Sequence, residues 1–279
     1  MRPGWFARFC GRPSALAGLA VLVTFVLVAA AAGAIAPGDP LTSAGPPFAA
    51  PSGGHWFGTD SLGRDVFAQV VHGSRATLVV GVATALIAAV IGTVVGGVSG
   101  YAGGIVDDVL MRVVEVVEIV PRFFLAVVLA ALFGPSVPVV VLLLGFTFWP
   151  DTARLLRAEV LSIRRRDFVV AERSIGLPAA AVLRRHVLPN TIGVVVVTGA
   201  LHVGSAVLVQ AGLAFLGLVD TDTVSWGGML QAAQGFITVA WWPAVFPGVA
   251  LSLLIVGANL LADGLLAALA VHAHRSQVL

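Results

Sequence analysis

The chain has 279 residues, of which 58% are hydrophobic and 11% are charged, and its mean hydropathy is +1.01. Because soluble domains carry about 25% charged residues, this composition indicates an integral membrane protein, and the absence of long polar segments argues against a second, soluble domain. The net charge is only +2, and all sixteen basic residues are arginine. The absence of lysine excludes a Walker A phosphate loop and a Schiff-base enzyme, since both need a lysine side chain.

Motifs for catalysis or metal binding are also missing. The single cysteine, Cys10, excludes an internal disulfide and a cysteine-cluster metal site. Neither H-E-x-x-H nor G-x-S-x-G occurs, and the histidines show no ligand spacing beyond His272 and His274 in the tail. We therefore predict no catalytic residues and no metal site, and we expect a transport protein rather than a membrane-embedded enzyme.

The first membrane span is predicted over residues 14–36. This apolar stretch can cross the ~30 Å hydrocarbon core, and Arg2, Arg8 and Arg12 precede it. The alternative is a cleaved signal peptide, but the apolar run exceeds the roughly 7–15 residues of a signal core. We expect an uncleaved span, with residues 1–13 in the cytoplasm.

A polar loop rich in glycine and proline is predicted from Pro37 to about Arg75. It contains the run F-G-T-D-S-L-G-R-D, in which Asp60, Arg64 and Asp65 are close enough to pair. The alternative for this loop is a metal site at His55, Asp60 and Asp65, but their spacing matches no common ligand pattern. The run resembles a motif of the C-type permease subunits in dipeptide, oligopeptide and nickel ABC importers. The motif residues are Phe57, Gly58, Thr59, Asp60, Gly63, Arg64 and Asp65.

Three further spans are predicted over residues 76–101, 109–133 and 137–156. The second span is rich in glycine, which lets helices approach closely, so we expect it inside the bundle. The third and fourth form a hairpin that turns at Gly134, Pro135 and Ser136. The pattern V-D-x-x-x-M-R, from Val106 to Arg112, again resembles the peptide-importer permeases.

The hairpin places four charges at or within the membrane, at Arg112, Glu115, Glu118 and Arg122. Their spacings of three and four residues predict one pair between Arg112 and Glu115 and another between Glu118 and Arg122. These charges either line a pathway or lock two helices together. Alternatively, the helix begins in the cytoplasmic interface and its charges extend into water.

An arginine-rich loop is predicted over residues 157–190. Eight of the sixteen arginines lie between Arg154 and Arg185, which marks this region as cytoplasmic. We predict two short helices, the first capped by Asp167 and the second starting with Pro178 in its first turn after a Gly-Leu-Pro break. Pro189 is expected to end the second helix, and Asn190 to cap the next one.

This loop resembles the coupling segment of ABC importer permeases, whose pattern is E-A-A, three residues, glycine, nine residues, then I-x-L-P. Val170 replaces the leading glutamate, which removes a reciprocal capping box, and Glu172 stands where the second alanine would be. The ending R-H-V-L-P-N resembles the peptide and nickel branch. By this resemblance, the residues that couple to the ATPases are Asp167, Ala171, Glu172, Arg173, Gly176, Leu177, Arg184, Arg185, His186, Leu188 and Pro189.

The last two spans are predicted over residues 191–216 and 243–269, followed by a cytoplasmic tail over residues 270–279. His202 lies within the fifth span and is expected to make a structural hydrogen bond. Asp263 adds an intramembrane charge near the inner end of the sixth. The outer loop between them carries Trp226, Trp241 and Trp242, which suit the membrane–water interface. The runs S-W-G-G-M-L and N-L-L-A-D-G-L also resemble the family.

The resemblance covers most of the chain and implies an all-α integral membrane fold. It implies six transmembrane helices in a type I importer bundle, with a cytoplasmic coupling helix between the fourth and fifth. Both termini would be cytoplasmic, in a prokaryotic inner or plasma membrane. The implied function is a permease subunit for ATP-driven import of dipeptides or oligopeptides.

The implied partners are a second, B-type permease, two ATP-binding subunits, an extracytoplasmic solute-binding protein and membrane lipid, without nucleic acid. This chain would hold no cofactor, because ATP and magnesium would bind to the ATPases. The alternative is an ion-coupled secondary transporter, which needs an acidic residue near the middle of the membrane. Its only candidates are Asp263 and the pair Glu115 and Glu118.

Overall fold

The computed structural model describes residues 9–134, 136–218, 220 and 222–275. This part of the chain is helical and has no β-strand; its only β-type pairings are two isolated bridges within the loop that precedes Val66. Within these residues, five helices are long and apolar enough to cross a membrane, and a bent pair brings the number to six when it counts as one span. The predicted all-α, six-span fold is therefore confirmed.

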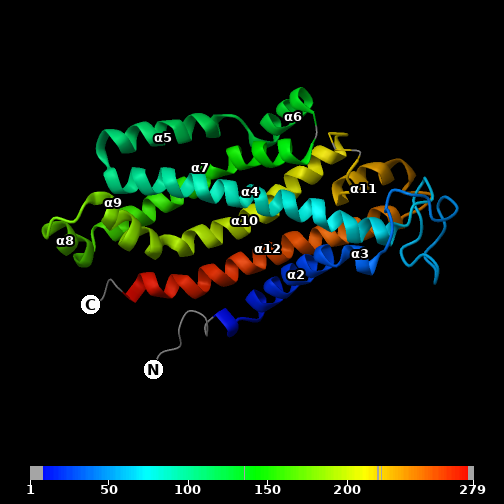
Figure 1. Cartoon of the computed structure of the whole chain (residues 1–279), viewed down its shortest axis with the longest axis horizontal. Helices are drawn as coiled ribbons and strands as arrows, with labels where there is room; N and C mark the ends of the chain where they lie inside the picture. The colour runs from blue at the N-terminus through cyan, green and yellow to red at the C-terminus, as the bar shows by residue number, and fades with distance from the viewer. Residues whose placement is uncertain (1–8, 135, 219, 221, 276–279) are drawn as a thin grey trace.

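The N-terminal and C-terminal helices form one side of the bundle (Figure 1). Helix α2 (Pro13–Ala30) packs along α12 (Trp242–Arg275), and a Cβ added at Gly18 would lie 2.5 Å from the backbone nitrogen of Leu261. The first span predicted over residues 14–36 corresponds to α2 and the short α3 (Ala32–Ile35), and the helix is interrupted between them at Ala31. Helix α12 also continues through residues 270–275, where the sequence predicts a tail.

Helix α4 (Val66–Ala102) lies at the centre and packs against α7 (Val137–Arg164) and α10 (Leu188–Phe215). A Cβ at Gly96 would lie 2.3 Å from the carbonyl oxygen of Ala153 in α7. The predicted position of this glycine-rich helix inside the bundle is confirmed. The predicted loop up to Arg75 is too long, because Asp65 caps α4 by accepting a 2.9 Å hydrogen bond from the backbone N–H of Ala68.

The third span is not one straight helix. Helices α5 (Gly104–Ile119) and α6 (Arg122–Phe133) meet at an angle of 73°. Pro121 has no N–H to continue the helix, and its ring disfavours the helical conformation at the preceding residue. Val120 is accordingly extended, with ψ 125°. The predicted turn after α6 starts at Gly134, where φ is +86°; Pro135 lies outside the described residues.

The two ends of the bundle carry different structures (Figure 1). The short helices α8 (Asp167–Ser174) and α9 (Ala179–Val182) lie at one end, towards which α2 begins and α12 finishes. The loop before α4, α3 and helix α11 (Trp226–Ala233), which is followed by the 3-10 turn η2 (Gln234–Phe236), lie at the other. The two segments that resemble family motifs, the one with α8 and α9 and the loop before α4, therefore lie at opposite ends of the molecule.

The tryptophans of the α11 region do not all suit a membrane interface. Trp226 is completely buried and donates from its indole to the carbonyl oxygen of Val70, at 2.8 Å. Trp242 is also buried, whereas Trp241 is exposed. The interface prediction is therefore wrong for Trp226 and Trp242, because their indole N–H groups bond to the protein backbone and their rings fill the core.

Candidate functional site

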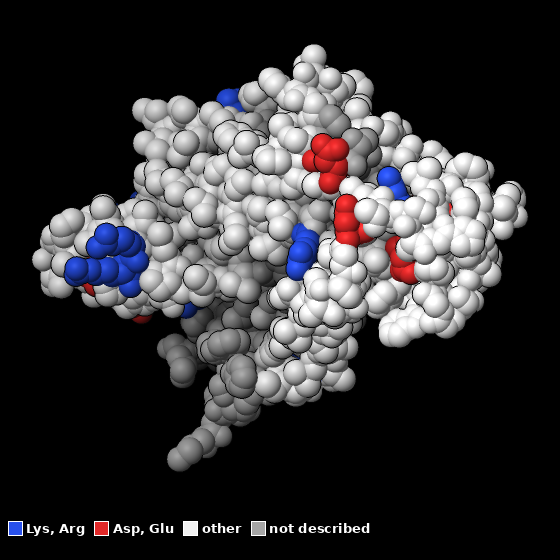
Figure 2. Space-filling model, turned by 45° about the vertical axis from the view of Figure 1, so that its right-hand side comes forward, with Lys and Arg blue, Asp and Glu red and all other residues white. Residues whose placement is uncertain are grey.

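The segment between α7 and α10 projects from the end of the bundle, where the side chains from Ala171 to Ala180 are all exposed except Glu172. Arginine side chains gather at this tip in Figure 2. Ile175 is 78% exposed and Leu177 is 39% exposed. An exposed apolar pair on a charged tip is suited to contact with another protein.

The base of the projecting segment is anchored by apolar packing. Val169, Val182 and Val187 are buried against three side chains on the last turns of α7, which are Leu156, Val160 and Ile163. The ion pair between Glu172 and His186, with an Oε1···Nδ1 distance of 2.7 Å, joins α8 to the π-helical turn η1 that leads into α10. Force on the tip can therefore pass directly to α7 and α10.

The predicted capping pattern of α8 is wrong. Asp167 is the first residue of the helix, and the N-cap position belongs to Arg166, whose side chain makes no capping bond with the described residues. Arg166 already has the extended backbone of a cap (φ −74°, ψ 146°), so the helix starts one residue earlier than a cap at Asp167 requires. Asp167 still places a negative charge in the first turn, where it favours the helix dipole.

The predicted break between the short helices is present, with a different role for its proline. Gly176 has φ +82°, a backbone conformation that costs glycine little. Pro178 is the N-cap residue of α9, not a residue within its first turn as predicted. Its extended backbone (φ −58°, ψ 137°) starts the helix at Ala179.

Pro189 does not end the second short helix, contrary to our prediction. Helix α9 continues through a π-helical turn, η1 (Leu183–Val187), into α10, where Pro189 lies in the first turn. The wider turn changes the hydrogen-bond register, so the missing N–H of proline does not stop the helix. Asn190 does not cap a new helix; its Nδ2 donates to the carbonyl oxygen of His186, at 2.6 Å.

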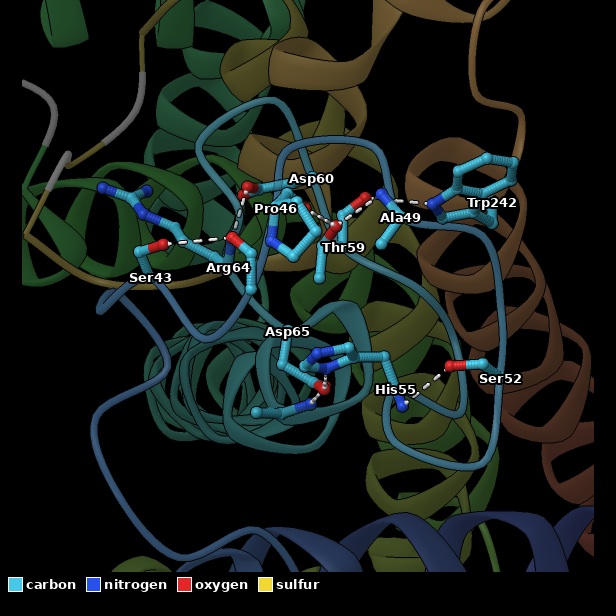
Figure 3. A network of polar contacts seen from close by, with 12 residues as sticks. Ser43, Pro46, Ala49, Ser52, His55, Thr59, Asp60, Arg64, Asp65 and Trp242 are labelled. Carbon is cyan, nitrogen blue, oxygen red and sulfur yellow. Dashed lines mark hydrogen bonds and ion pairs between the residues drawn. The ribbon is translucent and has the colours of Figure 1, made fainter.

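The motif loop at the opposite end is held by internal hydrogen bonds (Figure 3). The hydroxyl of Thr59 donates to the carbonyl of Pro46 at 2.6 Å and accepts from the N–H of Ala49 at 2.8 Å. The indole of Trp242 donates to the carbonyl of Thr59 at 3.0 Å. The glycines allow tight turns, since Gly58 and Gly63 both have φ +73°. The ring of Phe57 stacks on that of Phe246 in α12.

The acidic residues of this loop do not pair with Arg64 as predicted. Asp65 accepts a hydrogen bond from His55, at 2.8 Å, while it also caps α4. Asp60 accepts from two backbone N–H groups of its own turn and from the side chain of Gln69, at 3.0 Å. The two carboxylates therefore serve different bonds, and no group of three possible metal ligands occurs in the described ranges.

Three ion pairs connect the bent span to α7. Asp107 pairs with Arg157, Glu118 with Arg154, and Arg122 with Asp151. The expected pair between Glu118 and Arg122 is wrong, because the break at Val120 and Pro121 turns these two side chains apart. The predicted pair between Arg112 and Glu115 is present, at 2.8 Å, on an exposed surface.

The three α7 residues that form these ion pairs were not predicted from the sequence. Asp151, Arg154 and Arg157 recur every three residues, so they share one face of a helix. That spacing is a signal for pairing with a neighbouring helix, which the pairs confirm. His202 is buried and bonds the hydroxyl of Thr152 at 3.1 Å, as expected for a structural histidine. Asp263 is exposed on α12.

Comparison with known proteins agrees with this arrangement. Residues 90–272 match the family described as the inner membrane component of binding-protein-dependent transport systems. The oligopeptide transport system permease protein OppC of Escherichia coli (strain K12) is 38% identical over 265 residues, which cover 92% of this chain and 87% of the relative.

Two dipeptide transport system permease proteins DppC are also similar. The protein of Bacillus subtilis (strain 168) is 38% identical over 77% of this chain and 68% of its own length. The protein of Alkalihalophilus pseudofirmus is 34% identical over 90% of this chain and 83% of its own length. The comparisons do not favour the secondary transporter, and they identify a transport subunit rather than an enzyme. The chain belongs to the family of inner membrane components of binding-protein-dependent transport systems and is a permease subunit of an ABC importer.

Proposed function

We propose that this chain is the C-type permease of an ATP-driven importer of dipeptides or oligopeptides. It would form the translocation path with a second, B-type permease, while two ATPases bind ATP and magnesium and a solute-binding protein delivers the substrate outside. The observation that carries the proposal is the similarity, over 92% of the chain, to an oligopeptide permease. The projecting tip at residues 171–180 supplies the surface that such a permease needs for its ATPases.

The orientation that we propose puts α8, α9 and both termini in the cytoplasm. Seven of the sixteen arginines lie from Arg157 to Arg185, and positive residues favour the cytoplasmic side. The loop that carries Thr59 and the helix α11 then face outwards, towards the solute-binding protein. ATP binding would move the ATPases, and the anchored tip would transmit this movement to α7 and α10, which switches the path between two states.

The test is purification from native membranes in mild detergent, followed by identification of the partners by mass spectrometry. We expect a second permease, one or two kinds of ATPase and a solute-binding protein. The same complex, in proteoliposomes, should import radiolabelled dialanine, trialanine or pentaalanine only with ATP. A chain that is recovered alone and transports without ATP would contradict the proposal and revive the secondary transporter.

A further inference from the structure

A cluster of four charges lies where α5, α6 and α7 meet, and the proposed function gives it no role. The guanidinium of Arg122 pairs with Asp151 at 2.6 Å, and Arg154 pairs with Glu118. We call these four residues the charge cluster. Asp151 lies halfway along α7 and Arg154 lies one turn further towards the projecting tip, so the cluster is within the length of a helix that is long enough to cross the membrane.

The cluster is open on one side in this chain. The side chain of Arg154 is 56% exposed, those of Asp151 and Arg122 are about one-third exposed, and that of Glu118 is 22% exposed. The pair between Asp107 and Arg157 is different, because Asp107 is buried and also binds Ser99. Charges at this depth are costly against lipid, so their open side must face protein or water.

The backbone beside the cluster also needs protein or water around it. Helix α5 ends at Ile119 and α6 begins at Arg122, with the extended Val120 and Pro121 between them. An interrupted helix at membrane depth leaves backbone polar groups without helical partners, which is tolerated where the segment is buried in protein or lines a water-filled cavity. Both residues of the break are exposed. The exposed charges and the exposed helix break are two independent reasons to expect that this surface does not face lipid.

The inner side of the cluster is rigid. The guanidinium of Arg122 lies 5.0 Å from the ring centre of Phe148, which is buried. Phe148 in turn packs edge-on against His202. These contacts hold Arg122 in place while its charged group stays accessible, as a site for a passing ligand requires.

We propose that the charge cluster lines the translocation path and forms a transit site for zwitterionic peptides. Two arginines and two carboxylates balance to zero charge, which matches a peptide with one free ammonium and one free carboxylate. The arginines would receive the peptide carboxylate, and Glu118 or Asp151 the ammonium. Because each charge already has a partner, the peptide exchanges pairs without leaving a charge unpaired, so the site can release it again. This inference rests on the proposed import of peptides.

The first test measures access from water in the purified complex. Cys10 is replaced by serine, and single cysteines are placed at Glu118, Arg122, Asp151 and Arg154. Each complex is treated with a membrane-impermeant methanethiosulfonate, with and without ATP and vanadate. We expect labelling at all four positions, with a rate that changes between the two states. Val256, an exposed apolar residue of α12, is the control position and should stay unlabelled.

The second test measures the ligand. The alanine peptide that the unmodified complex imports fastest should slow labelling at Arg154→Cys, whereas its N-acetylated amide should not. The neutral double variant Arg122→Gln, Asp151→Asn keeps hydrogen bonding without charge. Its peptide uptake should fall roughly tenfold, the effect of losing about one charge-assisted hydrogen bond, while partner recovery and ATP hydrolysis stay unchanged.

Several outcomes would overturn this inference. Cluster cysteines that are unlabelled in both states, or protection by both peptides alike, would make the cluster a lock between helices or permeases. Full peptide uptake by the neutral double variant would likewise show that the cluster is a lock and not a transit site. Failure of the proposed function is distinguishable, because the unmodified complex would then show no ATP-dependent peptide uptake at all.

Discussion

The carboxylate of Asp107, in α5, accepts two hydrogen bonds from the guanidinium of Arg157, in α7, with N···O distances of 2.6 and 2.5 Å. The hydroxyl of Ser99, in α4, bonds the same carboxylate. Three helices are thus joined at the end of the bundle that carries the projecting tip. A bidentate pair of this kind is both strong and specific in its geometry.

Loss of this pair should weaken the inner end of the bundle. We expect Asp107→Ala to destabilise the chain by about 2–3 kcal/mol, since a hydrogen bond to a charged group contributes about 1.5–3 kcal/mol. The measurement is the fraction that stays monodisperse in detergent after heating. Arg157→Lys should give a smaller loss, because lysine keeps the charge without the bidentate geometry. If the unmodified chain, Asp107→Ala and Arg157→Lys were equally stable, the ion pair would contribute nothing to stability.

The apolar residue at the tip should matter for partner binding and not for folding. Ile175 is 78% exposed, so Ile175→Asp removes little buried surface and should leave thermal stability unchanged. Recovery of the ATPases with the purified permease should fall, because a charge would enter an apolar contact. Ile175→Leu is the matched control and should recover them normally. An undiminished recovery with Asp would exclude Ile175 from the ATPase contact.

The two exposed arginines of η1 offer a separate test of electrostatics. If Arg184 and Arg185 form charge pairs with the ATPases, the double change to glutamate should reduce assembly and make the remainder more sensitive to salt. Assembly is measured by recovery of the ATPases at low and high ionic strength. Intact assembly and transport in this double variant would leave the arginines only a role in membrane topology.

The close packing of α4 against α7 gives a prediction that depends only on steric fit. A Cβ at Gly96 would lie 2.3 Å from the carbonyl oxygen of Ala153, so Gly96→Ala must push α4 and α7 apart. We expect a loss of about 1–3 kcal/mol, the usual cost of overpacking. Gly199→Ala in α10 is the control, since no atom of another element in the described part of the chain lies within 4 Å of its added Cβ. Similar heat stability of the two variants would contradict this account.

Much of the fold could be predicted because lipid restricts the options. A chain with this hydropathy must satisfy its backbone polar groups by helices within the membrane, so the number of apolar stretches predicts the number of spans. The arginine-rich segment likewise predicts the projecting tip, since charged and proline-broken sequence cannot stay in hydrocarbon. The small residues of α4 predict its central place for the same kind of local reason.

The pairing of side chains needed the tertiary structure. Spacing along one helix suggested that Glu118 pairs with Arg122, but the bend at Pro121 gives each a partner on α7. The continuation of α9 through a π turn past Pro189 is equally invisible in the sequence, where proline normally signals an end. Periodicity and residue type determined the helices of this protein. Its ion pairs, its helix breaks and the burial of Trp226 were decided only by packing between distant segments, because such contacts depend on which helix faces become neighbours.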